Sequence, residues 1–414
     1  MTPEIHGSVA EGYEAVRDEF AAVVAAEPPD FAGQLSAYVQ ERRVVDLWAG
    51  AETDGETLFG VFSSTKGAAH LVVALLVQDG TLELDRELAR YWPEFAAEGK
   101  SAITLRELLA HRAGVVGSDA GFTDDELADD RAVAERLAGQ RPFWRPGTAF
   151  GYHALVIGAL TGEVVRRATG RTLQEVYEER IRAPYELDFF LGLPEAEEPR
   201  FRSVQPLVPT AEQQAVLDAR PTGPHTLTSI AFNEHVPEPG TLEGFANSRT
   251  VRAKGQASAG GVASARGLAG MYAAAISRVG GRAPLLKPDT IAEAGQVHSI
   301  GFDLVMRAHK AYGLGFQATA ENWYPFLGAG AFGHSGAGGT QAFADPRSGL
   351  AYGYTRRRMS FPGGAAPENE RLVRAVHRAA VAQRGPRRGD RDTEHFVRPV
   401  GRRSKTLDGP PHTG

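Results

Sequence analysis

The chain has no cysteine among its 414 residues, which excludes disulfides, thiolate metal sites and a cysteine nucleophile. It also has no uncharged apolar run long enough to cross a bilayer. Residues 1–20 lack the apolar segment and the small-residue cleavage site of a signal peptide. An excess of basic charge is missing too, because the formal net charge is -6, which disfavours a nucleic-acid partner. These absences predict a cytoplasmic protein with neither a membrane nor a nucleic acid as its partner.

The composition is that of an ordinary globular protein. Hydrophobic residues make up 42% of the chain and charged residues 23%, which suffices for a large core. The length exceeds one average domain and falls short of three. A bilobed enzyme is therefore the expectation before any motif is considered.

Three segments of the N-terminal part have clear patterns. Residues 9–27 form an amphipathic helical pattern that ends before Pro28 and Pro29. Residues 35–39 and 44–48 alternate as two strands of a hairpin. Residues 64–78 predict a helix, and between positions 68 and 77 only His70 interrupts its apolar residues. That helix should be buried on nearly every side.

The rest of the chain alternates between helical and strand patterns. A capping box at residues 104–107 opens a helix. Further helices are predicted at 124–137, 155–168, 173–181, 264–277 and 368–383, and strands at 313–317, 331–334, 340–344 and 351–355. Residues 194–250 are rich in proline and turn residues and have no assigned structure.

The order of these elements predicts a mixed α/β (α+β) fold. Both chain ends, about 1–80 and 250–384, should form an antiparallel sheet flanked by helices, and residues 81–249 an inserted, mainly helical lobe. One catalytic domain would thus span residues 1–384. Residues 385–414 are basic and rich in proline and glycine, which predicts a disordered tail.

Ser63 and Lys66 form an S-x-x-K pattern at the start of the apolar helix. A spacing of three puts both side chains on one face of the helix, one turn apart. The helix N-terminus offers free N–H groups that can stabilise an oxyanion. A lysine held against a buried helix should have a lowered pKa and could accept the serine proton. The alternative is an N-cap serine with a lysine that snorkels to the surface, which the apolar helix disfavours.

Two further segments carry candidate polar groups. Tyr152 lies on a loop just before a helix, where its hydroxyl could enter a cleft and carry a proton beside a cationic lysine. His334, Ser335 and Gly336 lie between two predicted strands, where glycine admits a ligand and histidine can donate a hydrogen bond or a positive charge. In isolation, a packing tyrosine is the better interpretation of the first segment. A glycine-rich bend with a structural histidine is the better interpretation of the second.

The three motifs together resemble the serine β-lactamase-like superfamily, which includes class C β-lactamases, family VIII carboxylesterases, D-aminopeptidases and DD-peptidases. Its members have S-x-x-K, then Y-x-N or a variant, then K-T-G, H-x-G or W-G-G. This chain has S-S-T-K at 63–66, Y-H-A at 152–154 and H-S-G at 334–336. The segments GTLELDRELARYWPEF, ITLRELLAHRAGV and FGHSGAGG resemble the esterase-type branch. The resemblance covers residues 5–384.

The resemblance implies an acyl-enzyme mechanism without a metal or other cofactor. Ser63 would attack a carbonyl after losing its proton to the pair Lys66 and Tyr152. The oxyanion hole would consist of the backbone N–H groups of Ser63 and Ala337. Water, or another nucleophile, would then release the acyl group.

The resemblance also implies a substrate-binding set. Its members are His153, Ala154, His334, Ser335 and Gly336. Ala154 departs from the family pattern, because β-lactamases and peptidases have there an asparagine that binds the substrate amide. The chain is therefore expected to act on small-molecule esters, as a serine hydrolase of the carboxylesterase type.

Several alternatives stay open at this point. Transfer of the acyl group to an amine or alcohol in a biosynthetic pathway would use the same catalytic residues. A β-lactamase, D-aminopeptidase or DD-peptidase, or a binding protein without catalysis, would share the fold. A nucleophile elbow is disfavoured, because residues 333–337 miss the last glycine of G-x-S-x-G and precede a predicted strand rather than a helix. A metallohydrolase is disfavoured by the lack of H-E-x-x-H.

Overall fold

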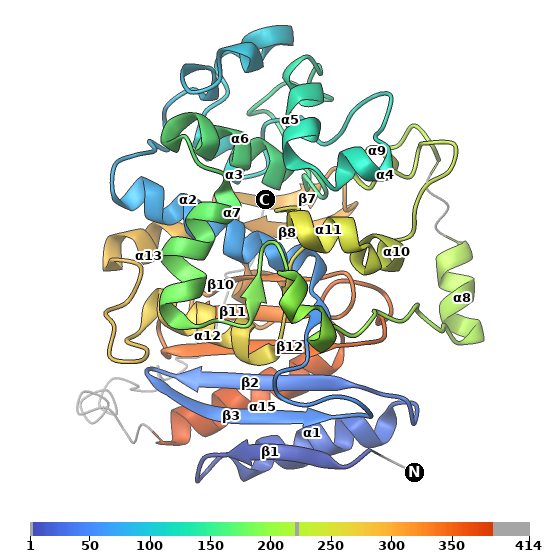
Figure 1. Cartoon of the computed structure of the whole chain (residues 1–414), viewed down its shortest axis with the longest axis vertical. Coiled ribbons are helices and arrows are strands. Elements are labelled where there is room, and N and C mark those ends of the chain that lie inside the picture. The colour runs from blue at the N-terminus through green and yellow to red at the C-terminus, as the bar shows by residue number, and fades with distance from the viewer. Residues whose placement is uncertain (1–2, 220–222, 384–414) are drawn as a thin grey trace, which may run out of the picture.

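A nine-stranded antiparallel sheet forms the base of the computed structural model, which describes residues 3–219 and 223–383 (Figure 1). In spatial order its strands are β1 (Ile5–Val9), β3 (Arg42–Ala49), β2 (Gly33–Val39), β12 (Leu350–Arg356), β11 (Gln341–Asp345), β10 (Phe332–Ser335), β9 (Gln317–Ala318), β8 (Ala308–Tyr312) and β7 (Ser299–Asp303). The two chain ends thus build one sheet, as predicted. The predicted tail, residues 385–414, lies outside the described residues.

Helices cover both faces of this sheet. The terminal helices α1 (Glu14–Ala26) and α15 (Glu368–Gln383) pack together on one face (Figure 1), where they bury Tyr352 and Tyr354 of β12. Helix α12 (Ala265–Ile276) packs on the other face. It lies so close that a Cβ at Gly353 would stand 2.6 Å from a backbone oxygen of α12. Alternating residues of β12 therefore face two different helical layers.

Helix α2 (Thr65–Gln78) runs through the centre of the molecule, between the sheet and the remaining helices (Figure 1). Those helices are α3 (Leu105–Leu109), α4 (Asp124–Leu127), α5 (Asp130–Ala138), α6 (Ile157–Thr169), α7 (Leu173–Tyr177), α8 (Ala211–Asp218), α9 (Leu227–Ala231), α10 (Leu242–Asn247), α11 (Arg249–Lys254) and α13 (Pro288–Gly295). Helix α14 (Thr319–Asn322) lies instead on the face of α1 and α15, where its Ala320 belongs to their apolar cluster. A small three-stranded sheet combines β4 (Phe59–Gly60), β6 (Val262–Ala263) and β5 (Phe189–Phe190).

Most of the predicted elements exist, and the mixed α/β fold with its antiparallel sheet is confirmed. The hairpin of β2 and β3, the helices α2, α12 and α15, and the strands β10, β11 and β12 lie where the patterns placed them. The capping box before α3 is present with both of its hydrogen bonds. The division into two lobes stays a prediction.

Four local predictions were wrong. The helix predicted at 9–27 starts only at Glu14, because residues 5–9 pair with β3 as an edge strand. The helix predicted at 124–137 is two helices, because the Asp129 side chain accepts the first N–H groups of α5 as its N-cap. The helix predicted at 173–181 is α7 followed by a π-helical turn at residues 178–182. The strand predicted at 313–317 is mostly a loop, in which Gly315 has a φ of +82°.

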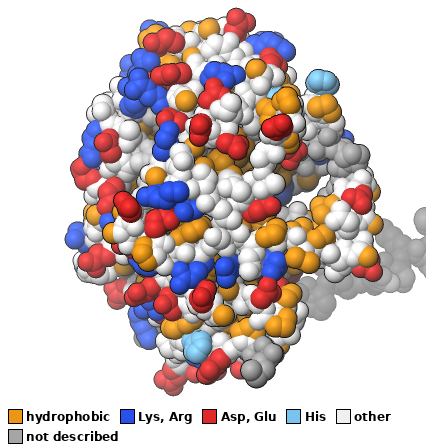
Figure 2. All heavy atoms as spheres, turned by 45° about the vertical axis from the view of Figure 1, so that its right-hand side comes forward, with side chains coloured by type: hydrophobic (Ala, Val, Ile, Leu, Met, Phe, Trp, Pro, Cys, Tyr) orange, Lys and Arg blue, Asp and Glu red, His pale blue; other side chains and the backbone are white. Residues whose placement is uncertain are grey.

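The surface in Figure 2 mixes basic and acidic side chains over the whole visible face instead of collecting one sign in a patch. Hydrophobic side chains gather in small groups between them (Figure 2). Within residues 3–219 and 223–383, no helix combines the length and the apolar character needed to span a membrane.

Candidate active site

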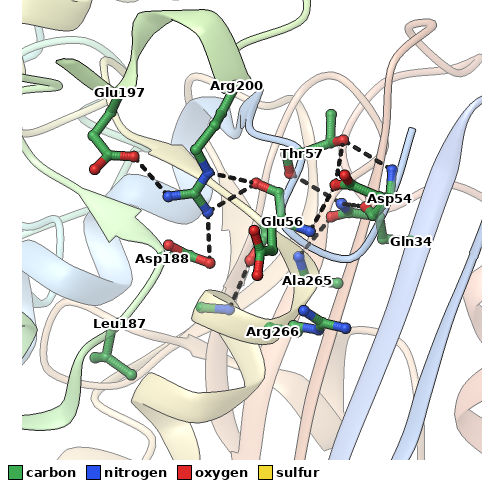
Figure 3. Close-up of polar contacts among 12 residues, drawn as sticks. Gln34, Asp54, Glu56, Thr57, Leu187, Asp188, Glu197, Arg200, Ala265 and Arg266 are labelled. Atoms are coloured by element: carbon green, nitrogen blue, oxygen red, sulfur yellow. Dashed lines mark hydrogen bonds and ion pairs between the residues drawn. The ribbon is translucent and has the colours of Figure 1, made fainter. Parts of the chain in front are cut away.

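The segment before Ser63 is fixed by a polar network around Arg200 (Figure 3). The Arg200 guanidinium donates two hydrogen bonds to the Glu56 carbonyl oxygen, at 3.0 and 2.8 Å, and pairs with Asp188 at 2.7 Å. From the side of β2, the Gln34 amide donates to the Thr57 carbonyl oxygen at 2.9 Å. The chain therefore enters β4 in one orientation, and β4 leads directly to the serine.

A strained turn presents Ser63 at the start of α2. Phe62 has a φ of +47°, a left-handed conformation that costs a residue with a Cβ on the order of 1–3 kcal/mol. It opens the 3₁₀ turn Phe62–Ser64, and α2 follows without a break. A Cβ at Gly336 would stand 2.2 Å from the Val61 carbonyl oxygen. Only glycine there lets the end of β10 come this close to the serine turn.

Lys66 lies beneath the serine and is completely buried. Its Nζ atom donates to Ser63 Oγ at 3.0 Å and to the carbonyl oxygens of Ala154 at 2.7 Å and Ser258 at 2.8 Å. Burial holds the pKa of Lys66 well below its ordinary value of 10.5. The lysine is therefore not a surface group, and the geometry allows its neutral form to take the serine proton.

Tyr152 contacts the same serine from the other side. Its hydroxyl is hydrogen-bonded to the Ser63 side chain, and Lys66 Nζ lies 4.9 Å from the centre of its ring. Burial raises the pKa of Tyr152, and the hydrogen bond with Ser63 offsets part of that increase. A cationic lysine was expected to make the phenol a better proton carrier. Burial outweighs this effect, because it lowers the pKa of Lys66 and raises the pKa of Tyr152. Both shifts favour the uncharged forms, an amine at Lys66 and a phenol at Tyr152.

Two residues that the sequence analysis missed hold Tyr152 in place. Asp303, fully buried at the end of β7, accepts the Tyr152 N–H at 3.2 Å and the Tyr312 hydroxyl at 3.0 Å. The ring of Tyr312 stacks on that of Tyr152 with 6.0 Å between centroids and 6° between planes. Burial raises the pKa of Asp303, and hydrogen bonds from backbone N–H groups act against that increase.

His334 is completely buried beside Tyr152, with the two ring centroids 5.9 Å apart. Its Nδ1 lies 2.8 Å from the Ser335 carbonyl oxygen, which favours the tautomer protonated at Nδ1. Burial, together with the nearby Lys66, lowers the pKa of His334 well below 6.5. Of the two roles expected for this ring, a hydrogen bond or a positive charge, the lowered pKa favours the hydrogen bond.

The third motif is tied to the serine turn through its backbone. Ser64 Oγ donates to the His334 carbonyl oxygen at 3.1 Å, which fixes β10 beside the turn. Ser335 donates from both N and Oγ to Gln317 Oε1, at 2.8 and 3.1 Å. Within the part of the chain that the structure describes, no hydrogen bond uses the N–H of Ser63 or of Ala337. Both N–H groups of the predicted oxyanion hole are thus free to bind a ligand oxygen.

Two residues of the predicted substrate-binding set, His153 and Ala154, contact other groups of the protein. His153 Nδ1 lies 3.4 Å from His111 Nδ1 and 2.8 Å from the Gly151 carbonyl oxygen. No contact that the structure describes joins it to Ser63. Ala154 serves through its backbone carbonyl, which holds Lys66. Their binding roles stay predictions.

Metal ligands do not gather in this site. Over residues 3–219 and 223–383, no group of three or more His, Asp and Glu side chains is placed to hold a metal ion. The polar groups around Ser63 instead form a set for activating a hydroxyl and transferring protons.

Comparison with known proteins points to the same chemistry. The model of the family described as Beta-lactamase matches residues 23–377. The chain is 29% identical over 359 residues to Esterase/beta-lactamase LipL of Mycobacterium tuberculosis, covering 80% of this chain and 78% of that protein. The structure of EstA from Arthrobacter nitroguajacolicus Rue61a is 40% identical, with a TM-score of 0.84, and the match covers 92% of this chain and 100% of EstA. A family VIII carboxylesterase structure is 32% identical, with a TM-score of 0.80, over 91% of this chain and 100% of the other.

Proposed function

The chain belongs to the Beta-lactamase family, and from that premise we propose that it is a serine ester hydrolase that forms an acyl-enzyme on Ser63. One observation carries the proposal: Ser63 Oγ is hydrogen-bonded by both Lys66 and Tyr152 in a buried site. The similarity to EstA and to a family VIII carboxylesterase supports esters as the substrate class. The expected resemblance to this superfamily is confirmed.

The proposed reaction begins with transfer of the Ser63 proton to neutral Lys66. The serine oxygen then attacks the ester carbonyl, and the backbone N–H groups of Ser63 and Ala337 stabilise the oxyanion. Tyr152 donates a proton to the departing alkoxide and is reprotonated from Lys66. Water attacks the acyl-enzyme by the same proton transfers in reverse order.

Esters should be turned over faster than β-lactams and peptides. Ala154 has no side-chain amide to pair with a substrate amide, and an unpaired buried amide costs about 1–3 kcal/mol, or roughly ten- to a hundredfold in rate. Neutral His334 offers no fixed charge to a β-lactam carboxylate. The measurement is kcat/KM for short-chain aryl esters, nitrocefin and a D-alanyl peptide. Equal turnover of nitrocefin or the peptide would contradict the ester assignment. The comparison matters because the relative LipL is named as both an esterase and a β-lactamase.

The pH profile should report the buried lysine. Neutral Lys66 is the proton acceptor, so kcat/KM should rise with pH as Lys66 loses its proton and then reach a plateau. Because burial lowers the Lys66 pKa from its ordinary value of 10.5, this plateau should begin well below that pH. The control is His334→Gln, in which the inflection should keep its position whatever the change in rate. An inflection that disappears in this variant would assign the titration to His334 instead.

Asp303 should act as a positioning residue for Tyr152. Asp303→Ala removes the acceptor of the Tyr152 N–H, so kcat should fall roughly tenfold or more while KM changes little, since a lost buried hydrogen bond costs about 1–3 kcal/mol. Asp303→Asn keeps an acceptor oxygen and should restore most of kcat. A purely structural role predicts instead equal activity per folded molecule in both variants, with only the melting temperature lowered.

Acyl transfer is the second candidate, because it uses the same residues up to the acyl-enzyme. It would be identified by an amine that speeds ester consumption and appears in an amide product. The substrate comparison above separates the proposal from β-lactamase, D-aminopeptidase or DD-peptidase activity. It also separates it from a binding role without catalysis. The cytoplasmic location and the lack of a nucleic-acid partner stay predictions.

A further inference from the structure

Two loops of the protein hold the amine of Lys66. One precedes α6, and the other joins α11 to β6. Each loop provides one backbone carbonyl oxygen to Lys66 Nζ, that of Ala154 at 2.7 Å and that of Ser258 at 2.8 Å. The third polar neighbour of Nζ is Ser63 Oγ, at 3.0 Å. The position of the lysine relative to the serine therefore depends on how the two loops are joined.

The two carbonyl oxygens decide which proton the neutral lysine can accept. A neutral amine has two N–H groups and one lone pair, and a carbonyl oxygen can only accept a hydrogen bond. Ala154 and Ser258 therefore occupy the two N–H groups of Lys66. Of the three neighbours of Nζ, only the Ser63 hydroxyl has a hydrogen to donate. The carbonyl oxygens thus direct the lone pair of Lys66 toward Ser63.

Gln256 joins the two loops through its side-chain amide, and it is 1% exposed. Its Nε2 donates to the Leu155 carbonyl oxygen at 2.7 Å. Its Oε1 accepts the N–H groups of Ser258 at 3.0 Å and of Ala259 at 2.7 Å. One side chain therefore holds both the segment that binds Lys66 through Ala154 and the segment that binds it through Ser258.

One of these hydrogen bonds acts on the same peptide group that binds the lysine. The carbonyl of Ser258 and the N–H of Ala259 belong to one planar peptide group, in which they point in opposite directions. Lys66 Nζ donates to its oxygen at 2.8 Å, and Gln256 Oε1 accepts its N–H at 2.7 Å. A rotation of this peptide group would break both bonds. Gln256 therefore fixes the direction in which the Ser258 oxygen meets the lysine.

The loops are packed too closely for another group to replace this amide. Gly158 donates its N–H to Ser258 Oγ at 2.7 Å, and a Cβ at Gly158 would stand 2.4 Å from the backbone carbon of Ala257. Asp130 accepts the Ala257 N–H at 2.9 Å. Because the loop is buried here, peptide groups that lose Gln256 would stay without a partner, which is the costly case for a polar group.

We propose that Gln256 is a positioning residue, which orients the carbonyl oxygens that bind Lys66 so that the lysine lone pair faces the Ser63 hydroxyl. This inference rests on the proposed function, since Gln256 acts only through the proton transfer from Ser63 to Lys66. Among the residues that the structure describes, no hydrogen bond joins Gln256 to Ser63 or Tyr152. Its effect on the reaction must therefore pass through the lysine.

The test is a double-mutant cycle of Gln256→Met and Lys66→Ala, measured as kcat and KM for a p-nitrophenyl ester. Gln256→Met keeps the length of the side chain and removes its amide. In the wild type this change should lower kcat roughly ten- to a hundredfold and change KM little, because buried peptide groups lose their partner. In the Lys66→Ala background it should lower kcat less than about twofold, since no lysine remains to be oriented.

Gln174 provides the matched control, because it is a second glutamine that holds the same loop. Its Nε2 donates to the Gly255 carbonyl oxygen at 3.0 Å and to Asp130 Oδ2 at 2.9 Å. Neither bond involves a peptide group that binds Lys66. Gln174→Met should lower at most the melting temperature and leave kcat per folded molecule nearly unchanged. A loss of kcat equal to that of Gln256→Met would count against the proposal, because any loosening of the loop would then suffice.

Two further results would overturn the proposal. The first is an unchanged kcat in folded Gln256→Met, and the second is an equal loss of kcat with and without Lys66. If Gln256→Met does not fold, Gln256→Asn takes its place in the cycle, since its amide is one methylene too short to join both loops, and the same two results count against the proposal. A Lys66→Ala variant that keeps the wild-type kcat would instead overturn the proposed function, and this inference with it.

Discussion

Replacement of Ser63 by alanine should abolish ester turnover, with a loss in kcat on the order of 10⁴- to 10⁶-fold, the range seen when a serine nucleophile is removed. The physical reason is that, among the residues the structure describes, no other hydroxyl is hydrogen-bonded to both Lys66 and Tyr152. The variant should stay folded, because Ser63 is only partly buried and its Oγ holds no backbone group. The measurement is the burst and steady-state rate with a p-nitrophenyl ester.

The controls for this variant are the two serines nearest in the site. Ser64→Ala removes a hydrogen bond to the His334 carbonyl oxygen, and Ser335→Ala removes one to Gln317. Both should lower the rate by much smaller factors, since each lost bond weakens positioning and leaves the nucleophile in place. A burst that survives in Ser63→Ala and vanishes in Ser335→Ala would transfer the nucleophile to Ser335.

Lys66 and Tyr152 should behave as one unit for proton transfer. Each single change, Lys66→Ala or Tyr152→Phe, should lower kcat by about 10²- to 10⁴-fold, the usual contribution of general acid–base catalysis. Both groups handle the proton of the same oxygen, so the double variant should cost little more than the worse single one. The measurement is a double-mutant cycle in kcat/KM. Fully multiplicative losses would show that the two residues act in separate steps.

Lys100 provides the matched control for that cycle. It is also completely buried and also donates to two carbonyl oxygens, those of Ala97 at 2.8 Å and Gln140 at 2.6 Å. Lys100→Ala should lower the melting temperature and leave kcat per folded molecule nearly unchanged. A loss of kcat equal to that of Lys66→Ala would mean that the effect at Lys66 reflects a buried lysine in general and not proton transfer.

The sequence was sufficient where residue type and spacing carry the function. An S-x-x-K at the start of an apolar helix requires Ser63 and Lys66 to share a helical face, and the structure joins them at 3.0 Å. The order of helices and strands likewise predicted that both chain ends meet in one sheet. Tyr152 followed from its place in the family pattern, and its contact with Ser63 agrees with that.

The sequence was insufficient to predict those contacts of the site that a backbone carbonyl or a residue on a distant strand supplies. Ser258 holds Lys66 through its carbonyl oxygen, and any residue can do that, so no pattern marks it. Asp303 lies on the edge strand β7 and Tyr312 on its neighbour β8, and both strands are short, partly exposed and without a clean alternation. The charge of His334 depends on its complete burial, which only the packed fold reveals.

The most direct test of the central claim is to locate the acyl group. The protein is mixed with a slowly hydrolysed p-nitrophenyl ester, and the trapped adduct is measured by intact mass and then by peptide mapping. The account predicts a single adduct of the acyl mass on Ser63, absent from Ser63→Ala and unchanged in Ser335→Ala. Ester turnover by the wild type without any such adduct, or an adduct on another residue, would contradict it.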